Sequence, residues 1–352
     1  MAPSCFSPSA CYRLVVADRE ACQKGLEALL DQPVVVPGVG LQPLPLDLLA
    51  PGHDLVDELR MLVTEVGADR IQLGVHQRVE EGARLGDRWR RLGHGNIVDV
   101  ASREEIIEFC DDLLDARGWE DYGPNGLQVP GEGEVLKLAT GVSAHRELLE
   151  RAAHSGAQLL LVHHGLFWDF HSRALSEQMA ARLRITLDAG LSVAGYHLPL
   201  DAHPVIGNNA LLCGRLGFEP DPHPFGQVKG RAIGVIGRNR DGIEAAALMR
   251  RVEEVCDREP LVFDTGPETV RSIGIISGAG ASEIHDAVEL GLDAFLTGEP
   301  AEHAMADARE GGLHFIAAGH YATETMGIRR LGELAAERFE LEHQFIDVPN
   351  PI

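Results

Sequence analysis

Histidine and carboxylate side chains follow four apolar, strand-like runs of this sequence. Two adjacent histidines, His163 and His164, come directly after the run Leu159–Val162 and precede Gly165. The other three positions are His197 with Asp201, Thr297-Gly298-Glu299, and His320 with Glu324. Open α/β sheets bind ligands at the carboxyl ends of their strands, and imidazole and carboxylate groups bind divalent metals. The pattern therefore predicts a metal site with enough ligands for two ions.

The adjacent histidines have two interpretations. Successive side chains of a strand point to opposite faces, so His163 and His164 can reach one cavity only where the strand stops and the backbone turns. Gly165 permits that turn, and each imidazole could then bind a different metal. The alternative is one histidine in the core and one on the surface.

The segment from His197 to Asp201 contains Pro199, which disfavours a helix, so we expect an extended loop there. Asp201 is a candidate metal ligand, and its alternative role is that of a turn residue or helix cap. His197 is a candidate ligand, a candidate for proton transfer, or a residue that orients Asp201. A buried histidine satisfied by backbone groups is the alternative for His197.

His320 and Glu324 are four residues apart. If a helix begins near Tyr321, these two side chains share one face and converge on one site. A carboxylate can bind two cations with its two oxygens, so Glu324 is the candidate bridging ligand. Taken alone, the pair is better explained as two solvated side chains on a helix surface. Its combination with the other strand-end residues favours the metal site.

Composition excludes several classes of function. The chain has 352 residues and a formal net charge of −23, with lysine only at Lys24, Lys137 and Lys229. The acidic charge disfavours nucleic acid as a partner, because phosphate binding needs clustered Lys and Arg. We expect no transmembrane helix and no signal peptide, and therefore a cytoplasmic protein. The six cysteines show no C-x-x-C spacing, which predicts reduced thiols, several of them buried.

Other nucleotide-binding and catalytic motifs are absent or ambiguous. Neither a P-loop nor a G-x-S-x-G motif is present. The segment Gly278-Ala279-Gly280 follows one expected strand and precedes an expected helix. It could hold an anion on backbone N–H groups, but an ordinary tight turn is the favoured interpretation.

The chain divides into three stretches. Residues 1–97 are expected to be an N-terminal extension of unknown role, and residues 98–220 and 221–352 to be two α/β halves. A capping box, Ser102 with Glu105, begins the first half, and Pro220–Pro224 is expected to link the halves. The expected strands are Leu136–Val142, Ala157–Val162, Leu191–Tyr196, Arg231–Ile236, Leu261–Phe263, Ser272–Ser277, Asp293–Leu296, Leu313–Ala318 and His343–Val348. The expected helices are Ala144–Ser155, Ser176–Ala189, Asn208–Leu216, Ile243–Val255, Ser282–Leu290, Glu302–Glu310 and one from Ala322.

Five segments resemble the signatures of the Nif-three-like dinuclear metal-centre proteins, which are also catalogued as GTP cyclohydrolase I type 2 homologues. In chain order they are Asp121–Val129, Leu161–Trp168, Tyr196–His203, Ile206–Asn209 and Gly319–Glu324. The resemblance covers about residue 98 to the C-terminus. Compact members of that family begin near residue 98, so the first stretch is extra here. The insertion that some longer members carry between the halves is absent.

The resemblance implies two α/β domains that flank a cleft with two divalent cations, and a homohexamer built as a ring of three dimers. It implies the ligands His163, His164, Asp201, His320 and Glu324, and leaves the metal open among Zn, Fe, Mn and Ni. The activity implied is hydrolytic opening of the GTP imidazole ring by metal-bound hydroxide, with C8 released as formate.

Two features leave alternatives to that activity. Three phosphates need cations, and this chain offers only scattered arginines such as Arg173, Arg271 and Arg329. A metal-dependent hydrolase of another substrate, such as a phosphoester, is therefore one alternative. The other is a non-enzymatic, metal-binding and ring-forming scaffold or interaction protein.

Overall fold

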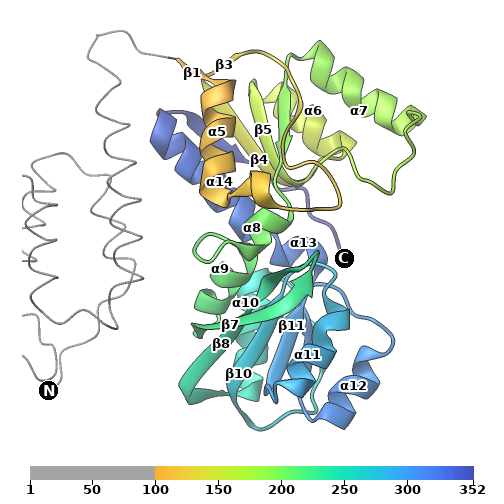
Figure 1. Ribbon diagram of the computed structural model, residues 1–352, viewed down its shortest axis with the longest axis vertical. Coiled ribbons are helices and arrows are strands. Elements are labelled where there is room, and N and C mark those ends of the chain that lie inside the picture. Colours follow the sequence, from red (N-terminus) through yellow and green to blue (C-terminus); the bar gives the residue numbers. More distant parts are fainter. Residues whose placement is uncertain (1–99) are drawn as a thin grey trace, which may run out of the picture. The chain divides into compact units, whose positions relative to one another are not determined.

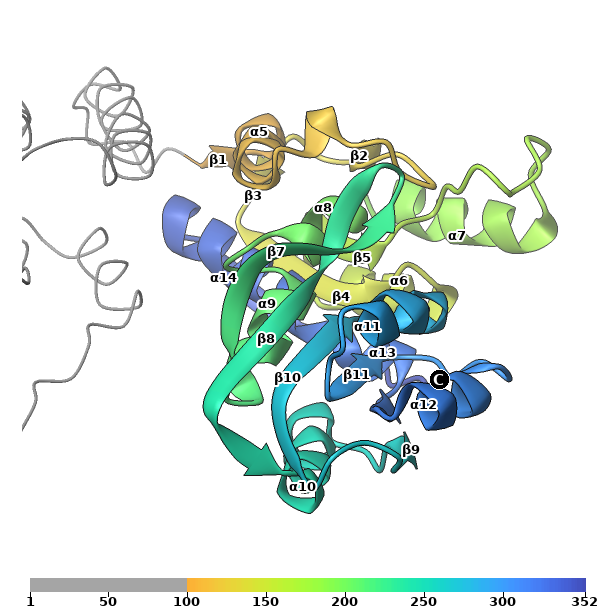
Figure 2. The ribbon, with the colours of Figure 1, turned by 60° about the horizontal axis from the view of Figure 1, so that its bottom comes forward.

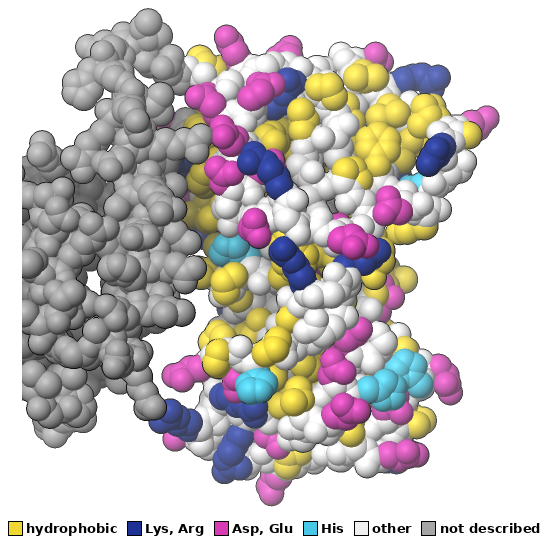
Figure 3. All heavy atoms as spheres, in the orientation of Figure 1, with side chains coloured by type: hydrophobic (Ala, Val, Ile, Leu, Met, Phe, Trp, Pro, Cys, Tyr) yellow, Lys and Arg dark blue, Asp and Glu magenta, His cyan; other side chains and the backbone are white. Residues whose placement is uncertain are grey.

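Two β-sheets, drawn one above the other in Figure 1, form the framework of residues 100–352, the part of the chain that the computed structural model describes. They belong to one unit, Ile97–Ile352. The expected N-terminal extension, residues 1–97, lies outside the described residues. Among residues 100–352, no helix is both long and apolar enough to span a membrane. Figure 3 shows Asp and Glu side chains spread over the visible face, in keeping with the acidic composition.

The first sheet has the strand order β13-β4-β5-β6-β2. Its strands are β2 (Gly126–Val129), β4 (Lys137–Ser143), β5 (Leu159–His164), β6 (Ser192–Gly195) and β13 (Glu342–Phe345). All are parallel except β2, which pairs antiparallel with β6. The central strand β5 is a continuous apolar run because both of its faces are covered. Two short strands, β1 (Ala101–Ser102) and β3 (Glu134–Val135), pair antiparallel as a separate two-stranded sheet.

Helices cover both faces of the first sheet. On one face are α5 (Arg103–Leu114) and α14 (Thr325–Phe339), and on the other are α6 (Arg146–His154) and α7 (Glu177–Asp188). The expected capping box begins α5: Ser102 Oγ accepts a hydrogen bond from the Glu105 N–H, and Glu105 Oε2 accepts one from the Ser102 N–H. This prediction is confirmed.

The second sheet has the order β7-β8-β10-β11-β12-β9. Its strands are β7 (Glu219–Val228), β8 (Arg231–Glu244), β9 (Leu261–Phe263), β10 (Thr269–Ile276), β11 (Ala294–Thr297) and β12 (His314–Ala317). Strands β10, β11 and β12 are parallel, and the flanking strands are antiparallel. Side chains alternate between the two faces: Phe295 and Phe315 pack under α11 (Ile284–Glu289) and α12 (Ala304–Gly311). Leu296 and Ile316 pack under α9 (Asn208–Arg215) and α10 (Ala245–Cys256).

The two sheets are joined in more than one place. After β12 the chain returns through α13 (His320–Thr323) and α14 to β13, which pairs with β4 in the first sheet, so residues 221–352 contribute strands to both sheets. The long β7–β8 hairpin also reaches back toward the first sheet (Figure 2). At its tip, Lys229 lies over the Tyr122 ring and Arg231 over the Trp119 ring.

Two sequence-based predictions of local structure are wrong, and proline explains both. The expected loop between His197 and Asp201 is the short helix α8 (Leu198–Ala202), with Pro199 in its first turn. Proline is tolerated there because those N–H groups have no partner within the helix. The expected link Pro220–Pro224 lies within β7, an edge strand of the second sheet. Proline fits an edge strand because its missing N–H costs no ladder hydrogen bond on the solvent side.

The described cysteines are reduced and buried, as expected. Cys110, Cys213 and Cys256 are free thiols in the apolar cores. Burial raises the pKa of Cys213 and of Cys256 to about 12, which makes both thiols unreactive near neutral pH. The remaining three cysteines lie outside the described residues.

Candidate metal centre

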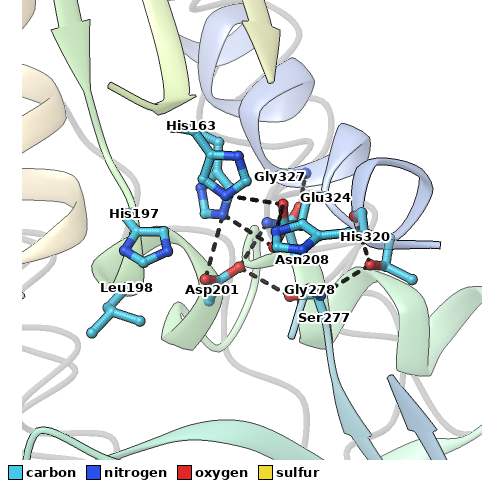
Figure 4. A network of polar contacts seen from close by, with 12 residues as sticks. His163, His197, Leu198, Asp201, Asn208, Ser277, Gly278, His320, Glu324 and Gly327 are labelled. Carbon is cyan, nitrogen blue, oxygen red and sulfur yellow. Dashed lines mark hydrogen bonds and ion pairs between the residues drawn. The ribbon is translucent and has the colours of Figure 1, made fainter. Parts of the chain in front are cut away.

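The five strand-end residues predicted as ligands converge at one place, where the first sheet meets the chain that returns from the second. Figure 4 labels four of them, His163, Asp201, His320 and Glu324. His163 and His164 are the last residues of β5, Asp201 lies in α8, and His320 begins α13. Glu324 lies between α13 and α14, so the helix expected to carry it is interrupted at that residue. His163 is fully buried, and the exposed fractions of Asp201 and Glu324 are only 5% and 2%.

One donor set consists of His163, Asp201 and Glu324. His163 Nε2 lies 3.4 Å from Asp201 Oδ2 and 3.6 Å from Glu324 Oε1. Ligands that share a metal with bonds of about 2.0–2.2 Å lie roughly 3 Å apart. These three atoms therefore need only small movements to hold one cation.

The other donor set consists of His164, His320 and the same glutamate. His164 Nε2 and His320 Nε2 each lie 3.2 Å from Glu324 Oε2. Glu324 thus turns one oxygen toward each donor set, which is the geometry of a bridging carboxylate.

Two atoms at the centre of this arrangement are buried without a hydrogen-bond partner among the described residues. They are His163 Nε2 and Glu324 Oε2. An unpartnered buried polar atom costs about 1–3 kcal/mol, and more when it is charged. A cation in each donor set would satisfy both atoms, so the residues present fit a pair of metal ions.

The outer nitrogen of each imidazole is held by the protein. His163 Nδ1 pairs with the Tyr196 carbonyl at 2.9 Å, and His164 Nδ1 pairs with Ser143 Oγ at 3.0 Å. His320 Nδ1 lies 2.5 Å from Glu299 Oε1. Each contact leaves Nε2 directed at the centre and fixes the ring, as partners of metal-binding histidines do. Glu299, singled out in the sequence as a strand-end carboxylate, therefore supports His320 from outside the donor sets.

Asp201 is oriented by two residues, Asn208 and Ser277, for which the sequence analysis predicted no role in the site. Asn208 Nδ2 and Ser277 Oγ both donate to Asp201 Oδ1, at 2.8 and 3.0 Å, which leaves Oδ2 facing His163. Asn208 Oδ1 in turn accepts the Gly327 N–H of α14 at 2.8 Å. The sequence signals for this support were the Asn208-Asn209 pair at the start of an expected helix and its place in the family-like segment Ile206–Asn209.

Two glycines make room for the site. Gly278 has φ +66°, and a Cβ there would lie 2.3 Å from Glu324 Oε1. Its N–H donates to Thr323 Oγ1 and that of Gly280 to Thr297 Oγ1, so the segment is a tight turn engaged within the protein. Strand β5 ends directly before Gly165, where the turn was expected, although the φ of Gly165 is not positive. The small size of Gly165 also matters, because a Cβ there would lie 2.2 Å from Gln128 Nε2.

The electrostatics of the cluster follow from burial and from the two acidic groups. When no cation is bound, burial acts to lower the pKa of His163, but Asp201 and Glu324 raise it well above its usual range. Burial likewise opposes the effect of Glu324 and Glu299 on His320, yet its pKa rises to about 9. Burial dominates for His164 and lowers its pKa to about 3. The pKa of Glu324 lies well below its usual range because the imidazoles outweigh burial.

His197 lies beside the donor sets, with its ring centroid 5.2 Å from that of His163 and 5.5 Å from that of His164. Its Nδ1 pairs with Asp121 Oδ1 at 2.7 Å, so its side chain is not satisfied by backbone groups alone. Asn125 Nδ2 holds the second oxygen of Asp121. The Asp121–Asn125 support was not predicted, because these residues precede His197 by more than 70 positions.

Aromatic side chains border the open side of the site. The Trp168 ring meets the His197 ring edge-on at 5.1 Å, and Trp168 Nε1 donates to the Gly165 carbonyl at 3.1 Å. The Tyr122 ring also lies near His197, with ring centroids 6.3 Å apart. A small cavity lies beside His197, and among the residues that line it are His163, His197 and Trp168.

Comparison with known proteins identifies the family. The model of the Duf34/NIF3 (NGG1p interacting factor 3) family matches residues 101–351. The chain belongs to the Duf34/NIF3 family. The Nif-three-like resemblance seen in the sequence motifs is thereby confirmed.

Curated and structural relatives of this NIF3 chain agree with the match. Proteins named GTP cyclohydrolase 1 type 2 homolog are 41% identical over 246 residues in Pseudomonas aeruginosa and 42% identical over 253 residues in Escherichia coli K12. Each match spans 70% of this chain and 97% or 98% of the relative. The solved structure of protein ybgI, described as of unknown function, is 40% identical in sequence and superposes with a TM-score of 0.67. The match covers 72% of this chain and 100% of the ybgI chain. A Thermus thermophilus crystal structure is 29% identical, with a TM-score of 0.62 and coverage of 72% and 100%.

Removing residues 1–96 should leave the NIF3 unit able to fold and to bind metal. The family match begins at residue 101, and every residue of the two donor sets lies after it. Metal content per chain and the thermal midpoint, compared with those of the full chain, check this. A shortened chain that folds but has lost its metal would contradict the separation into an extension and a metal-binding unit.

Replacing Asn209 with alanine should destabilise the protein by about 2–4 kcal/mol, since three buried hydrogen bonds are lost together. Asn209 Nδ2 donates to the carbonyls of Asp201 and Ile233, and its Oδ1 accepts the Ser277 N–H. Urea unfolding of the metal-depleted protein measures the effect. The matched control is Asn350→Ala, since Asn350 is exposed near the C-terminus and accepts only the Ile352 N–H. Equal free energies of unfolding for the two variants would contradict the prediction.

Proposed function

We propose that this NIF3-family protein is a hydrolase that depends on two divalent cations. One cation is held by His163, Asp201 and Glu324, and the other by His164, His320 and Glu324. The observation that carries the proposal is the pair of buried, unpartnered atoms, His163 Nε2 and Glu324 Oε2, at the meeting point of the two donor sets. Imidazole and carboxylate donors without thiolate suit Zn, Fe, Mn or Ni.

The chemistry of such a site divides between the cations and the chain. Bound there, the cations would supply Lewis-acid chemistry, which activates water and stabilises negative charge on reacting oxygens. Glu324 would contribute one oxygen to each donor set, and Asn208 and Ser277 hold Asp201 in place. His197, held at Nδ1 by Asp121, presents Nε2 on the side of the donor sets and is the proposed proton-transfer residue.

The relatives' name suggests the substrate with which to begin. It points to hydrolytic opening of the GTP imidazole ring, with C8 released as formate. The rim of the site offers Trp168 and Tyr122 for stacking on a purine, and aromatic stacking is worth about 1–3 kcal/mol per base. Lys229 lies 4.7 Å from the Tyr122 ring centroid and supplies a positive charge at the rim.

A screen of the zinc-, iron-, manganese- and nickel-loaded protein tests the proposal. The substrates are GTP, assayed by formate release, then other nucleotides, phosphoesters and peptides. Activity that a chelator abolishes and that added metal restores supports a hydrolase. Cleavage of a phosphoester alone would move the proposal to that substrate. Inactivity toward every substrate would favour a metal-binding scaffold, for which the proposed homohexameric ring, measurable by light scattering, would be the functional unit.

Cation binding should release about two protons per chain near pH 7.5. With no cation present, the pKa values of His163 and His320 are raised by the neighbouring carboxylates, so both imidazoles carry protons that a cation must displace. His164 contributes none, because burial lowers its pKa to about 3. Affinity should therefore increase with pH up to about 9. Calorimetric titration with zinc in buffers of different ionisation enthalpy counts the protons, and a heat that is the same in every buffer would contradict this prediction.

A further inference from the structure

A second cluster of histidine and carboxylate side chains lies on the surface, on helices α11 and α12. These helices pack side by side against one face of the second sheet. The buried faces at their contact carry the small residues Ala287, Ala304 and Ala308, which allow the helices to approach closely. As a result the rings of His285 and His303 stack with their centroids 5.8 Å apart and an interplanar angle of 11°. Figure 3 shows histidine side chains gathered over this pair of helices.

The third member of the cluster is Asp307, one helical turn after His303. His303 Nδ1 lies 2.7 Å from Asp307 Oδ2, and His285 Nε2 lies 3.8 Å from the same oxygen. Ligands of one metal with bonds of about 2.0–2.2 Å lie roughly 3 Å apart. The first pair already has that separation, and rotation of the exposed His285 ring brings its nitrogen into range.

The surroundings of the cluster suit a labile ion. The exposed side-chain fractions are 63% for His285, 44% for His303 and 23% for Asp307. Water can therefore complete the coordination, as in sites with two histidines and one carboxylate on one side of the metal. None of the three residues belongs to the donor sets of the central site.

We propose that His285, His303 and Asp307 form a separate binding site for one divalent transition-metal ion. The donors favour zinc, nickel, cobalt or copper over magnesium and calcium, which prefer oxygen ligands. This proposal stands on the surface geometry and does not depend on the hydrolase assignment.

Zinc titration of the untagged, full-length protein tests the proposal, with a chromophoric chelator as competitor. The double variant His285→Gln with His303→Gln should bind one zinc ion fewer per chain than the wild type. Asp307→Asn should weaken that ion's binding by at least about 10-fold. The same comparison in a Glu324→Gln background should again show a difference of one ion, whatever happens at the central site.

The matched control is His223→Gln. His223 is also an exposed histidine near a carboxylate, with its Nδ1 3.9 Å from Asp221 Oδ1, but within residues 100–352 no second histidine completes a donor set there. His223→Gln should leave the zinc stoichiometry unchanged. An unchanged stoichiometry in the double variant would overturn the proposal. So would an equal loss in His223→Gln, because that would show zinc binding to surface histidines in general.

Chemical footprinting provides a measurement that needs no variant. In the wild-type protein, zinc should slow modification of His285 and His303 by diethyl pyrocarbonate by about 10-fold or more, because a coordinated imidazole cannot react. His223 should react at the same rate with and without zinc. Unprotected His285 and His303 at saturating zinc would overturn the proposal.

Discussion

On the proposed function, Glu324→Gln should remove both central cations together and bring hydrolysis to background. The carboxylate faces both donor sets, and the neutral amide that replaces it keeps the size but loses the charge. A cation pair supplies several kcal/mol of transition-state stabilisation, so we expect turnover to fall by about 1,000-fold or more. Elemental analysis of the purified variant, with circular dichroism to verify folding, measures the loss.

Two further variants make the Glu324 result specific. Asp201→Asn alters a ligand of only one donor set, so metal content should fall by about one ion while the other remains. Glu299→Gln is the same chemical change at the partner of His320, outside the donor sets. It should weaken binding by about 10–100-fold without abolishing it. Retention of two ions by Glu324→Gln would refute the bridging role.

His197→Gln should leave metal content nearly intact and reduce turnover by about 100-fold or more, since general acid–base catalysis contributes at least that factor. Asp121→Asn should reproduce part of the loss, because Asp121 accepts the hydrogen bond that orients the imidazole. The pH profile of kcat provides the decisive readout. If His197 transfers protons, the change of kcat with pH in His197→Gln should differ from that of the wild type. The matched control is His154→Gln, an exposed histidine on α6 that should retain full activity.

Metal analysis of His197→Gln also separates the two chemical roles of this residue. His163, His164 and His197 lie close enough to form a donor set of their own. A variant that loses one ion would make His197 a ligand. A variant that keeps both ions and full turnover would remove His197 from the mechanism.

Local patterns in the sequence were enough to predict the α/β class and to select the residues that converge at the site. Apolar runs marked β5 and β12, and the polar residues directly after such runs pointed to the strand ends. The two wrong predictions treated proline as a residue that interrupts helices and strands. Pro199 fits the first turn of α8, and Pro222 fits an edge strand, and neither context is visible from neighbouring residues.

The supporting contacts depend on pairings between distant parts of the chain. Asp121 meets His197, Asn208 meets Gly327, and His343 meets Thr140 across 203 positions. Hydrophobic periodicity reports which face of an element is buried, but it does not report which element covers that face. The partners of the site residues could therefore be identified only from the three-dimensional structure.

The position of β13 sets the order of events during biosynthesis. Strand β4 pairs on one side with β13, whose residues Glu342–Phe345 are synthesised long after those of β4 and after Glu324. Until Glu342–Phe345 have been synthesised, the first sheet lacks its edge strand β13. The two donor sets likewise lack Glu324, the residue that they share, until the chain has reached that position. Domains fold as units, so we expect the two donor sets to come together only after β13 has been synthesised and has paired with β4. On the proposed function, cations would therefore bind after translation has passed β13.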